Sequence, residues 1–318
     1  MEQEPTVKKE LFLISRHLEP VIQYLDPAIT VHRSAEVDDL EGFLEETGPD
    51  IAAIATDVFT GVSAELMAAL PNRKLVASLG VGYETIDVDY ATAHGVTVTN
   101  TPDVLNDDVA DLAIALMLSV CRRIPQADRY VRDGHWLRGP YALTKKLTGK
   151  RLGILGLGRI GKAVAKRAAA FDMDISYHGR HEQRDQPYRY FADPRELADY
   201  VDVLVVLVPE NEQTCGMVNR AMLEALGPQG NLINVARGSI VDEPILVEML
   251  VRGEIGGAGL DVFANEPNVP EALFDLDNVV LQPHTGSATH DTRRAMGMLV
   301  VDNLQAFFKG EPLLTPVN

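Results

Sequence analysis

The sequence predicts an α/β fold with two domains, each built on a parallel sheet. Its 318 residues exceed the roughly 250–300 residues at which a single hydrophobic core stops growing. The composition, with 46% hydrophobic and 24% charged residues, is that of an ordinary globular protein. In both halves of the chain, short apolar runs alternate with helical stretches, a pattern typical of parallel sheets covered by helices on both faces.

The first third of the chain contains four candidate strands. Each is a short apolar run that ends at polar residues or glycine, and they span residues 10–14, 51–55, 74–79 and 96–99. We expect only helical stretches between the first two. A strongly apolar helix follows from Asp107 to Cys121, and polar and acidic residues stand at its beginning, where the helix dipole favours them. We interpret this helix as a link between the two halves.

A second series of strands and helices begins at residue 152. Its candidate strands span residues 152–155, 174–177, 203–208, 231–235, 257–260 and 279–281, and a final helix spans roughly 289–308. Residues 134–150, which precede the series, are polar and irregular. Only this half contains a glycine-rich turn of the kind that binds nucleotides.

The charge and the cysteine content exclude several classes of protein. A net charge of −17 makes general attraction to nucleic acid or to an anionic membrane surface unfavourable. No apolar stretch has the roughly 20 residues needed to span a bilayer, and Met1–Glu10 lacks the apolar core of a secretory signal. Cys121 and Cys215 lie far apart and outside any metal-ligand spacing, so we expect neither a disulfide nor a metal site, and a cytoplasmic location.

The glycine-rich turn joins the strand at 152–155 to the helix that follows it. Its sequence, Gly156-Leu157-Gly158-Arg159-Ile160-Gly161, has the spacing of a dinucleotide-binding turn. Gly156 allows the tight turn, Gly158 lets the backbone approach a pyrophosphate, and Gly161 lets the helix lie close to the strand. Unpaired N–H groups at the helix N-terminus favour the negative charge, which lets a strongly acidic chain bind an anionic cofactor.

The residues after the second strand of this series predict which dinucleotide binds. An acidic residue at this point reads the ribose 2′-hydroxyl of NAD(H), but this chain has Gly179-Arg180. Because an arginine pairs with a 2′-phosphate, we expect NADP(H) to be preferred; NAD(H) is the alternative if Arg180 is only a solvated loop residue. His178, His181 and Arg184 are secondary candidates.

An arginine, a carboxylate and a histidine follow three later strands, at the ends where open α/β sheets bind ligands. They are Arg237, Glu266 and His284. We expect Arg237 to bind a substrate carboxylate and polarise its carbonyl, His284 to donate a proton, and Glu266 to hold the imidazole and favour its charged form. Taken singly, each also has a structural interpretation, as an ion-paired arginine, a surface turn residue or a capping histidine. Together they predict the reduction of a 2-keto acid.

Over nearly its whole length the chain resembles the D-isomer-specific 2-hydroxyacid dehydrogenases. The resemblance rests on the glycine turn and on further motifs at residues 100–102, 107–111, 234–238, 260–267 and 283–289. Within the family, the chain length and Arg180 are most similar to the NADP-preferring glyoxylate/hydroxypyruvate reductases. The resemblance implies a flavodoxin-like substrate domain, residues 1–101 and 289–318, into which a dinucleotide-binding Rossmann domain, residues 102–288, is inserted. It also implies a homodimer in which an arm carrying Trp136 reaches the partner's active site.

The resemblance further implies a set of ligand contacts. For the cofactor they are the glycine turn, Gly179, Arg180, Val208, Pro209, Thr214, Val235, Ala236, Asp261, His284 and Gly286. For the substrate they are Arg237, His284, Ser287, Trp136 and the backbone N–H groups of Val81 and Gly82, whose turn is otherwise a plain connection between strand and helix.

Some positions depart from the patterns of particular family members. Gly179 stands where NADP-preferring reductases often carry Ser, so we expect less strict discrimination between the cofactors. Glu266 argues against formate dehydrogenase, which typically carries Gln there, and the end of the chain at Asn318 against the long phosphoglycerate dehydrogenases. The width of the substrate pocket is expected to depend on loops such as residues 56–61, whose Val58 and Phe59 either cap the pocket or only pack against their neighbours.

We therefore expect NADPH-dependent reduction of a small anionic acid, glyoxylate or hydroxypyruvate, to the D-2-hydroxy acid. The alternatives are the same chemistry on 2-ketogluconate or another 2-keto acid, the oxidation of phosphite, and a non-catalytic regulator that senses a dinucleotide.

Overall fold

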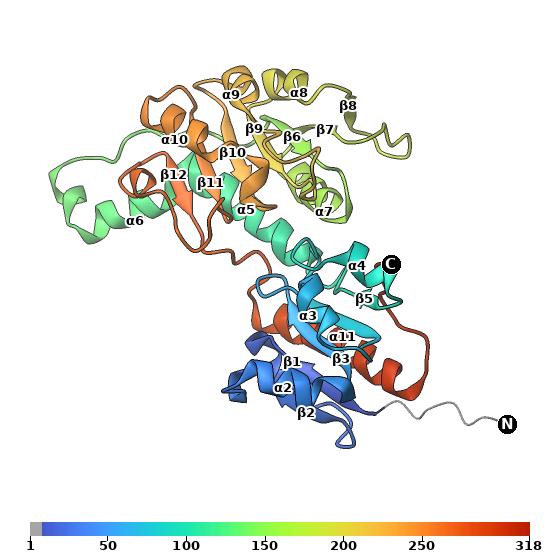
Figure 1. The fold of residues 1–318 in the computed structure, drawn as a ribbon. Helices are drawn as coiled ribbons and strands as arrows, with labels where there is room; N and C mark the ends of the chain where they lie inside the picture. The colour runs from blue at the N-terminus through green and yellow to red at the C-terminus, as the bar shows by residue number, and fades with distance from the viewer. Residues whose placement is uncertain (1–7) are drawn as a thin grey trace. The chain divides into compact units, whose positions relative to one another are not determined.

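The computed structural model describes residues 8–318 and divides into two compact units (Figure 1). Unit 1 comprises the described residues up to Leu105 together with Thr289–Asn318, and unit 2 is Asn106–Ala288. The first seven residues of the segment that was expected to lack a secretory signal lie outside the described part.

Unit 1 contains a five-stranded, all-parallel sheet in the order β2-β1-β3-β4-β5. This is the flavodoxin-like order, so the sequence-based prediction of a flavodoxin-like fold is confirmed. The strands are β1 (Glu10–Leu13), β2 (Thr30–Arg33), β3 (Ile51–Asp57), β4 (Leu75–Leu79) and β5 (Thr97–Thr99). The edge strand β2 lies where only helical stretches were expected, and that expectation was wrong. None of its four residues is buried, so it lacks the apolar run that marks the other strands.

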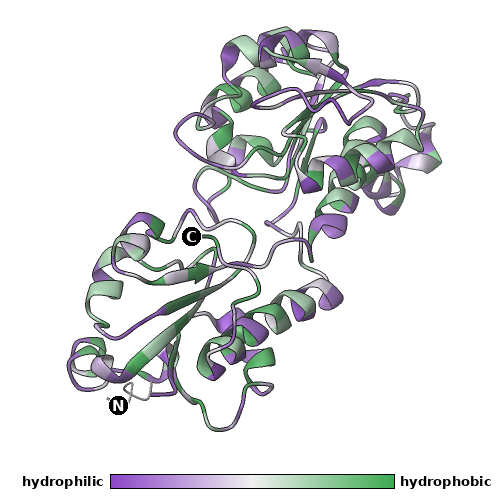
Figure 2. Ribbon diagram, turned by 90° about the vertical axis from the view of Figure 1, so that its right-hand side faces the viewer, coloured by the Kyte–Doolittle hydropathy of each residue, from purple (hydrophilic) through white to green (hydrophobic). Residues whose placement is uncertain are grey.

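The helices of unit 1 are α1 (Glu19–Ile22), α2 (Leu40–Glu46), α3 (Ala64–Ala68), α4 (Val88–Ala93) and α11 (His290–Lys309). Every residue of the central strands β3 and β4 is buried, which explains why these strands are apolar throughout rather than alternating. Figure 2 shows this hydrophobic character along the strands of the unit. Thr289 begins α11 by accepting a hydrogen bond from the Thr292 N–H, so the predicted start of the final helix is confirmed.

Unit 2 contains a seven-stranded parallel sheet in the order β12-β11-β10-β9-β6-β7-β8. Counted from its own first strand, the order is 7-6-5-4-1-2-3, the Rossmann arrangement with one added strand, as the sequence predicted. Its strands are β6 (Arg151–Leu155), β7 (Asp174–His178), β8 (Arg189–Phe191), β9 (Val203–Val206), β10 (Asn231–Asn234), β11 (Gly257–Leu260) and β12 (Val279–Leu281). The short edge strand β8 was not predicted, and only one of its residues is buried.

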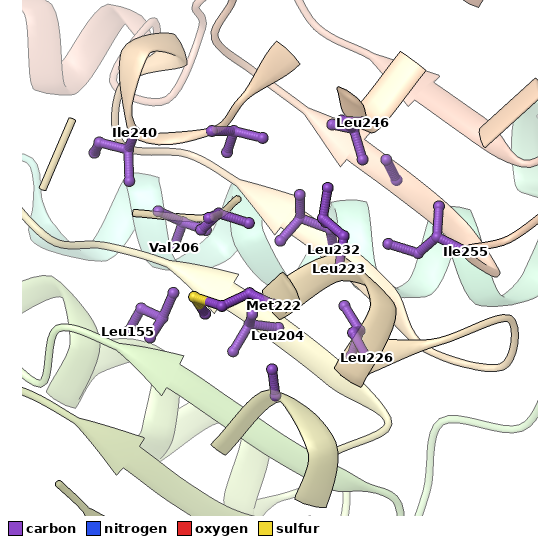
Figure 3. Close-up of a cluster of buried hydrophobic side chains, with 14 of the residues drawn as sticks. Leu155, Leu204, Val206, Met222, Leu223, Leu226, Leu232, Ile240, Leu246 and Ile255 are labelled. Carbon is purple, nitrogen blue, oxygen red and sulfur yellow. The ribbon is translucent and has the colours of Figure 1, made fainter. Parts of the chain in front are cut away.

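The helices of unit 2 are α5 (Asn106–Arg122), α6 (Ile124–Arg132), α7 (Arg159–Ala169), α8 (Pro194–Tyr200), α9 (Arg220–Leu226) and α10 (Glu243–Val251). α5 packs against α7 and against β10 and β11, while α8, α9 and α10 pack beside one another. The core under these last helices joins Leu155, Leu204, Leu232 and Leu246 (Figure 3). Among the helices of the described residues, none is long and apolar enough to cross a membrane.

Candidate functional site

The glycine turn lies where the Rossmann sheet of unit 2 reverses its strand order, between β6 and β9. The Gly156 N–H donates to the His178 carbonyl at the end of β7, and the Leu207 N–H donates to the Leu155 carbonyl. The turn is therefore fixed by both neighbouring strands. Open α/β sheets bind their ligands at this reversal.

The glycines of the turn fit a bound pyrophosphate. Gly156 has φ +99°, and a Cβ here would lie 2.8 Å from the Leu207 backbone. A Cβ on Gly161 would lie 2.3 Å from the Gly156 carbonyl oxygen, so only glycine lets α7 begin this close to the turn. By contrast, a Cβ on Gly158 would meet nothing within 4 Å. The open space beside Gly158 lets a dinucleotide approach the backbone closely. The N–H groups at the N-terminus of α7 favour the negative charge of its phosphates.

The loop after β7 carries the predicted cofactor-selecting residues. Arg180 is exposed, and a Cβ on Gly179 would meet nothing within 4 Å. The Nδ1 atom of His178 does not face the cofactor loop but lies 3.0 Å from the Phe191 carbonyl oxygen. Gln183 donates to the Leu157 carbonyl at 2.8 Å and thereby ties the loop to the glycine turn. Gln183 was not among the predicted site residues, since a glutamine in a polar loop gives no signal in the sequence.

The other predicted cofactor residues lie near the ends of β9 and β10. Val208 and Val235 are buried. Thr214 is also buried, and its hydroxyl donates to the Pro209 carbonyl at 2.6 Å and accepts from the Asn211 N–H at 2.9 Å. The Thr214 side chain therefore closes the loop after β9, and this loop borders the place where β9 meets β6.

Glu266 and His284 form a direct pair in unit 2. Oε2 of Glu266 lies 2.7 Å from Nδ1 of His284, and the two side chains are 27% and 24% exposed. Oε1 of Glu266 accepts a hydrogen bond of 3.0 Å from the Phe263 N–H, which fixes the carboxylate. A histidine whose Nδ1 is held in this way presents Nε2 for proton transfer.

Glu266 is held in its ionised form. Burial raises the pKa of its carboxyl group, but the hydrogen bonds from His284 and the Phe263 N–H, together with the charges of His284 and Arg237, outweigh burial and lower it overall. The carboxylate can therefore stabilise a protonated imidazole.

Arg237 follows β10 in a turn that its neighbours hold in place. Asn234, which is fully buried, donates to the Arg237 carbonyl at 2.8 Å and accepts from the Ala236 N–H at 3.1 Å. A Cβ on Gly238 would lie 2.0 Å from the Phe263 backbone, so only glycine lets this turn lie against the loop that leads to Glu266. Asn234 belongs to the motif at residues 234–238, and the structure shows that it positions the arginine turn.

Asp261 holds the backbone of the segment that carries His284. Its carboxylate, 1% exposed, accepts from the N–H groups of Thr285 at 2.7 Å and Gly286 at 2.9 Å, and its carbonyl accepts from the His284 N–H at 2.8 Å. His284 has φ +53°, a left-handed conformation that residues other than glycine seldom adopt. Burial raises the pKa of the Asp261 carboxyl group even though these donors and the charge of His284 lower it. Ser287 follows this clamped segment and is half-buried.

The predicted substrate turn of unit 1 follows β4. The Gly80 N–H donates to the Thr101 hydroxyl at 2.9 Å, and the Asn100 side chain donates to the Val81 carbonyl at 2.8 Å. Among the described residues, the N–H groups of Val81 and Gly82 have no acceptor. Two such groups in one turn are suited to binding a carboxylate.

Trp136 lies in the segment that joins α6 to β6. This arm, residues 124–143, exposes several large apolar side chains, and Trp136 itself is 67% exposed; the others are Ile124, Val131, Leu137 and Leu143. The arm packs on itself around Tyr130, whose ring lies 5.1 Å from that of Tyr141 and 5.4 Å from that of His135.

Unit 2 therefore brings together four of the predicted residues, Arg237, Asp261, Glu266 and His284, at the carboxyl edge of its sheet. The arrangement supplies a cation, a supported proton donor and a dinucleotide-binding turn, which are the components of a hydride-transfer site.

The chain is similar to known proteins over most of its length. Residues 114–286 match the family model described as D-isomer specific 2-hydroxyacid dehydrogenase, NAD binding domain. Hydroxyphenylpyruvate reductase from Plectranthus scutellarioides is 51% identical over 93% of this chain and 94% of its own length. Glyoxylate/hydroxypyruvate reductase A from Arabidopsis thaliana is 50% identical over 86% of this chain and 88% of its own.

Solved structures show the same likeness. The NADPH-dependent glyoxylate/hydroxypyruvate reductase from Sinorhizobium meliloti, in complex with NADP and malonate, is 42% identical, with a TM-score of 0.89 over 98% of this chain and 97% of that one. The match of the family model to more than half of the chain, and identities above 40% over nearly its whole length, lead to one conclusion. The chain belongs to the D-isomer specific 2-hydroxyacid dehydrogenase family, whose members are oxidoreductases that use a nicotinamide dinucleotide.

Proposed function

We propose that the protein reduces glyoxylate and hydroxypyruvate to the corresponding D-2-hydroxy acids with NADPH. The observation that carries the proposal is the 2.7 Å pair of Glu266 and His284, which lies with Arg237 at the edge of a dinucleotide-binding sheet. The relatives named for the same reaction, and the malonate complex of the Sinorhizobium meliloti enzyme, support a small anionic substrate.

Arg237 binds the substrate carboxylate and polarises the 2-keto group. A guanidinium offers paired donors that match a carboxylate, and the overall charge of −17 leaves little other positive potential to attract the substrate. In unit 1, Val81 and Gly82 offer backbone N–H groups suited to a carboxylate, and in unit 2 Ser287 offers a hydroxyl. These are the contacts that the resemblance implies.

His284 supplies the proton. When bound, a nicotinamide would supply the hydride for the carbonyl carbon. As negative charge develops on the carbonyl oxygen, Nε2 of His284 donates its proton to that oxygen, which becomes the hydroxyl group of the product. Glu266 stabilises the protonated imidazole before the transfer and keeps Nδ1 occupied, so only Nε2 faces the substrate.

NADPH is the preferred cofactor because Arg180 follows β7, where an NAD-specific turn has an acidic residue. The N-terminus of α7 beside Gly158 would hold the pyrophosphate of the cofactor. In this proposal the remaining cofactor contacts come from Val208, Pro209, Thr214, Val235, Ala236, Asp261 and Gly286.

We also propose that the protein is a cytoplasmic homodimer. The exposed apolar side chains of the arm support a second copy of the chain as the partner, with Trp136 entering that copy's site. Cys121 and Cys215 are both free, which suits a reducing compartment.

The test of the activity is to follow NADPH oxidation with a panel of keto acids. Glyoxylate and hydroxypyruvate are expected to be the best substrates, compared with hydroxyphenylpyruvate and 2-ketogluconate; phosphite oxidation is measured with NADP. Tight binding of NADPH without turnover of any panel member would overturn the proposal in favour of a dinucleotide-sensing regulator.

The cofactor preference is tested separately with Arg180→Met. Loss of the arginine is expected to raise the KM for NADPH about 10- to 100-fold, the effect of one hydrogen-bonded charge pair, and to leave the KM for NADH nearly unchanged. Arg195→Met, which removes another exposed arginine of unit 2, is the matched control. Equal effects on the two cofactors would show that Arg180 does not read the 2′-phosphate.

A further inference from the structure

The loop after β7 is held at both of its ends by tyrosines. At its beginning, the Gly179 carbonyl accepts a hydrogen bond of 3.2 Å from the Tyr190 hydroxyl. At its end, the Gln183 N–H donates to the Tyr177 hydroxyl at 2.6 Å. Arg180 lies between these two attachment points, and all of these residues belong to unit 2.

The two tyrosines form one support for the loop. Tyr177 belongs to β7 and Tyr190 to β8, where they are paired in register, and their rings lie 5.4 Å apart. Tyr177 is fully buried, so close packing fixes the hydroxyl that accepts from the Gln183 N–H. The short edge strand β8 therefore has a purpose besides completing the sheet, because it places the Tyr190 hydroxyl beside the loop.

The Gln183 side chain connects the same loop to the glycine turn. Its Nε2 atom donates at 2.8 Å to the carbonyl of Leu157, the residue between Gly156 and Gly158. The Gln183 carbonyl in turn accepts from the Gln186 N–H at 3.0 Å. Gln183 thus uses its N–H, its carbonyl and its side chain to join the turn that suits a pyrophosphate to the loop that carries the cofactor-selecting arginine.

The Arg180 side chain itself is exposed. Within residues 8–318 it forms no ion pair, although Glu182 and Asp185 lie close to it in the sequence. An arginine on a mobile loop loses backbone and side-chain freedom when it binds a phosphate, and this loss lowers the affinity. Because hydrogen bonds fix the backbone on both sides of Arg180, most of the backbone ordering takes place on folding rather than on binding.

We propose that Tyr190 and Gln183, supported by Tyr177, are positioning residues that raise the preference for NADP(H). They hold the loop in the conformation in which Arg180 binds the 2′-phosphate of the cofactor. NAD(H) lacks this phosphate, so its affinity should depend little on the same contacts. The inference rests on the proposed cofactor preference and adds to Arg180 the residues through which the loop reads the phosphate.

The first test removes one hydroxyl group. Tyr190→Phe is expected to raise the Kd of NADPH about 2- to 10-fold, the effect of one neutral hydrogen bond, and to change the Kd of NADH by less than about 2-fold. Tyr188→Phe removes a hydroxyl that forms no hydrogen bond within the described part of the chain, and it is the matched control. Fluorescence titration measures both constants. An equal rise for both cofactors, or no rise for NADPH, would overturn the role of Tyr190.

The second test removes the connection to the glycine turn. Gln183→Met keeps the length of the side chain but not its donor, and it is expected to raise the Kd of NADPH about 2- to 10-fold, with a smaller effect on NADH. Gln186→Met, which removes only a side-chain hydrogen bond to the exposed Asp185, is its control. A Kd of NADPH that stays at the control value would overturn the role of Gln183.

A double-mutant cycle separates a positioning role from a merely structural one. If Tyr190 and Gln183 act through Arg180, then Tyr190→Phe and Gln183→Met should have little effect on the Kd of NADPH in the Arg180→Met background, where the guanidinium is already absent. The same fold-changes in both backgrounds would overturn the inference, because the two residues would then act without the arginine.

These titrations also distinguish the failure of this inference from the failure of the proposed function. If no keto acid is reduced, the proposed activity fails, and the binding constants still decide the role of the loop. A wild type that binds NADPH and NADH equally would overturn the cofactor preference and this inference with it. A wild type that prefers NADPH, with additive effects in the cycle, would overturn this inference alone.

Discussion

Units 1 and 2 each place a histidine against a carboxylate at the carboxyl edge of a parallel sheet. The two histidine–carboxylate distances are nearly equal, 2.8 Å for His17 and Asp57 and 2.7 Å for His284 and Glu266. The surroundings differ. The Asp57 side chain is 3% exposed and that of His17 57%, whereas Glu266 and His284 share an intermediate burial of 27% and 24%.

The difference shows that the remaining contacts of the carboxylate decide what a histidine–carboxylate pair does. Asp57 accepts from three other donors, the Ser15 hydroxyl and the N–H groups of Phe59 and Thr60. It therefore organises a loop and leaves His17 at the surface. Glu266 binds one other donor, the Phe263 N–H, so most of its effect falls on His284. In addition, the buried Asp261 fixes the backbone of the His284 segment through three N–H groups, whereas the His17 N–H donates to the Ser15 hydroxyl at 3.1 Å.

The largest effect is expected for a substitution of His284, the histidine proposed to donate the proton. His284→Gln is expected to lower kcat about 10²- to 10⁴-fold with cofactor affinity nearly unchanged, because it removes a proton donor that acts in the transition state. Steady-state kinetics and NADPH titration measure the two quantities. His94→Gln, which changes an exposed histidine of unit 1, is the control. Retention of most of the turnover would place the acid elsewhere.

Glu266→Gln tests whether this carboxylate acts through the imidazole. We expect a fall of about 10- to 100-fold in kcat, since one charged hydrogen bond to His284 is lost. Steady-state kinetics and NADPH titration separate the loss of turnover from any loss of cofactor affinity, with Glu271→Gln at an exposed position as the control. A fall in kcat no larger than that of the control would contradict this role.

Asp57→Asn is expected to act on stability rather than on chemistry. It should lower the free energy of unfolding at pH 7 by about 1.5–3 kcal/mol, because the Ser15 and His17 hydrogen bonds lose their charged acceptor. In the wild type, these hydrogen bonds and those of the Phe59 and Thr60 N–H groups outweigh burial and hold the Asp57 pKa below its ordinary value of 3.8. Its contribution is therefore present above pH 3.8 and lost as the pH falls through the lowered pKa.

The difference in the free energy of unfolding between Asp57→Asn and the wild type should therefore become smaller in acid. Urea unfolding at several pH values measures this difference. Asp38→Asn, at an exposed position, should change stability by less than about 0.5 kcal/mol. A difference in unfolding free energy that is constant from pH 7 to pH 3 would contradict stabilisation by the ionised Asp57 carboxylate.

The smallest expected effect lies at the cofactor loop. Gly179→Ser adds a hydroxyl where the structure leaves open space. It should lower the KM for NADPH about 2- to 10-fold, which corresponds to the free energy of one neutral hydrogen bond. Gly179→Ala fills the same space without the donor and is the control. An equal change with both variants would mean that the hydroxyl does not reach the phosphate.

Most of the fold could be predicted from the sequence because its signals are local. Buried parallel strands such as β3 and β9 are continuous apolar runs, and the structure confirms strands at all ten predicted positions within a few residues. β9 is shorter than predicted and ends at Val206 rather than 208. The edge strands β2 and β8 were missed because a strand paired on one side needs no continuous apolar run.

The sequence by itself determined the two parallel sheets, the glycine turn and the identity of Arg237, Glu266 and His284, because each depends on residue types at short, fixed spacings. Only the tertiary structure decided that Glu266 holds His284, that Asp261 holds the His284 backbone, and that Ser15 and His17 meet Asp57 in unit 1. These contacts join residues 18 to 42 positions apart, and no local pattern encodes which strand ends become neighbours.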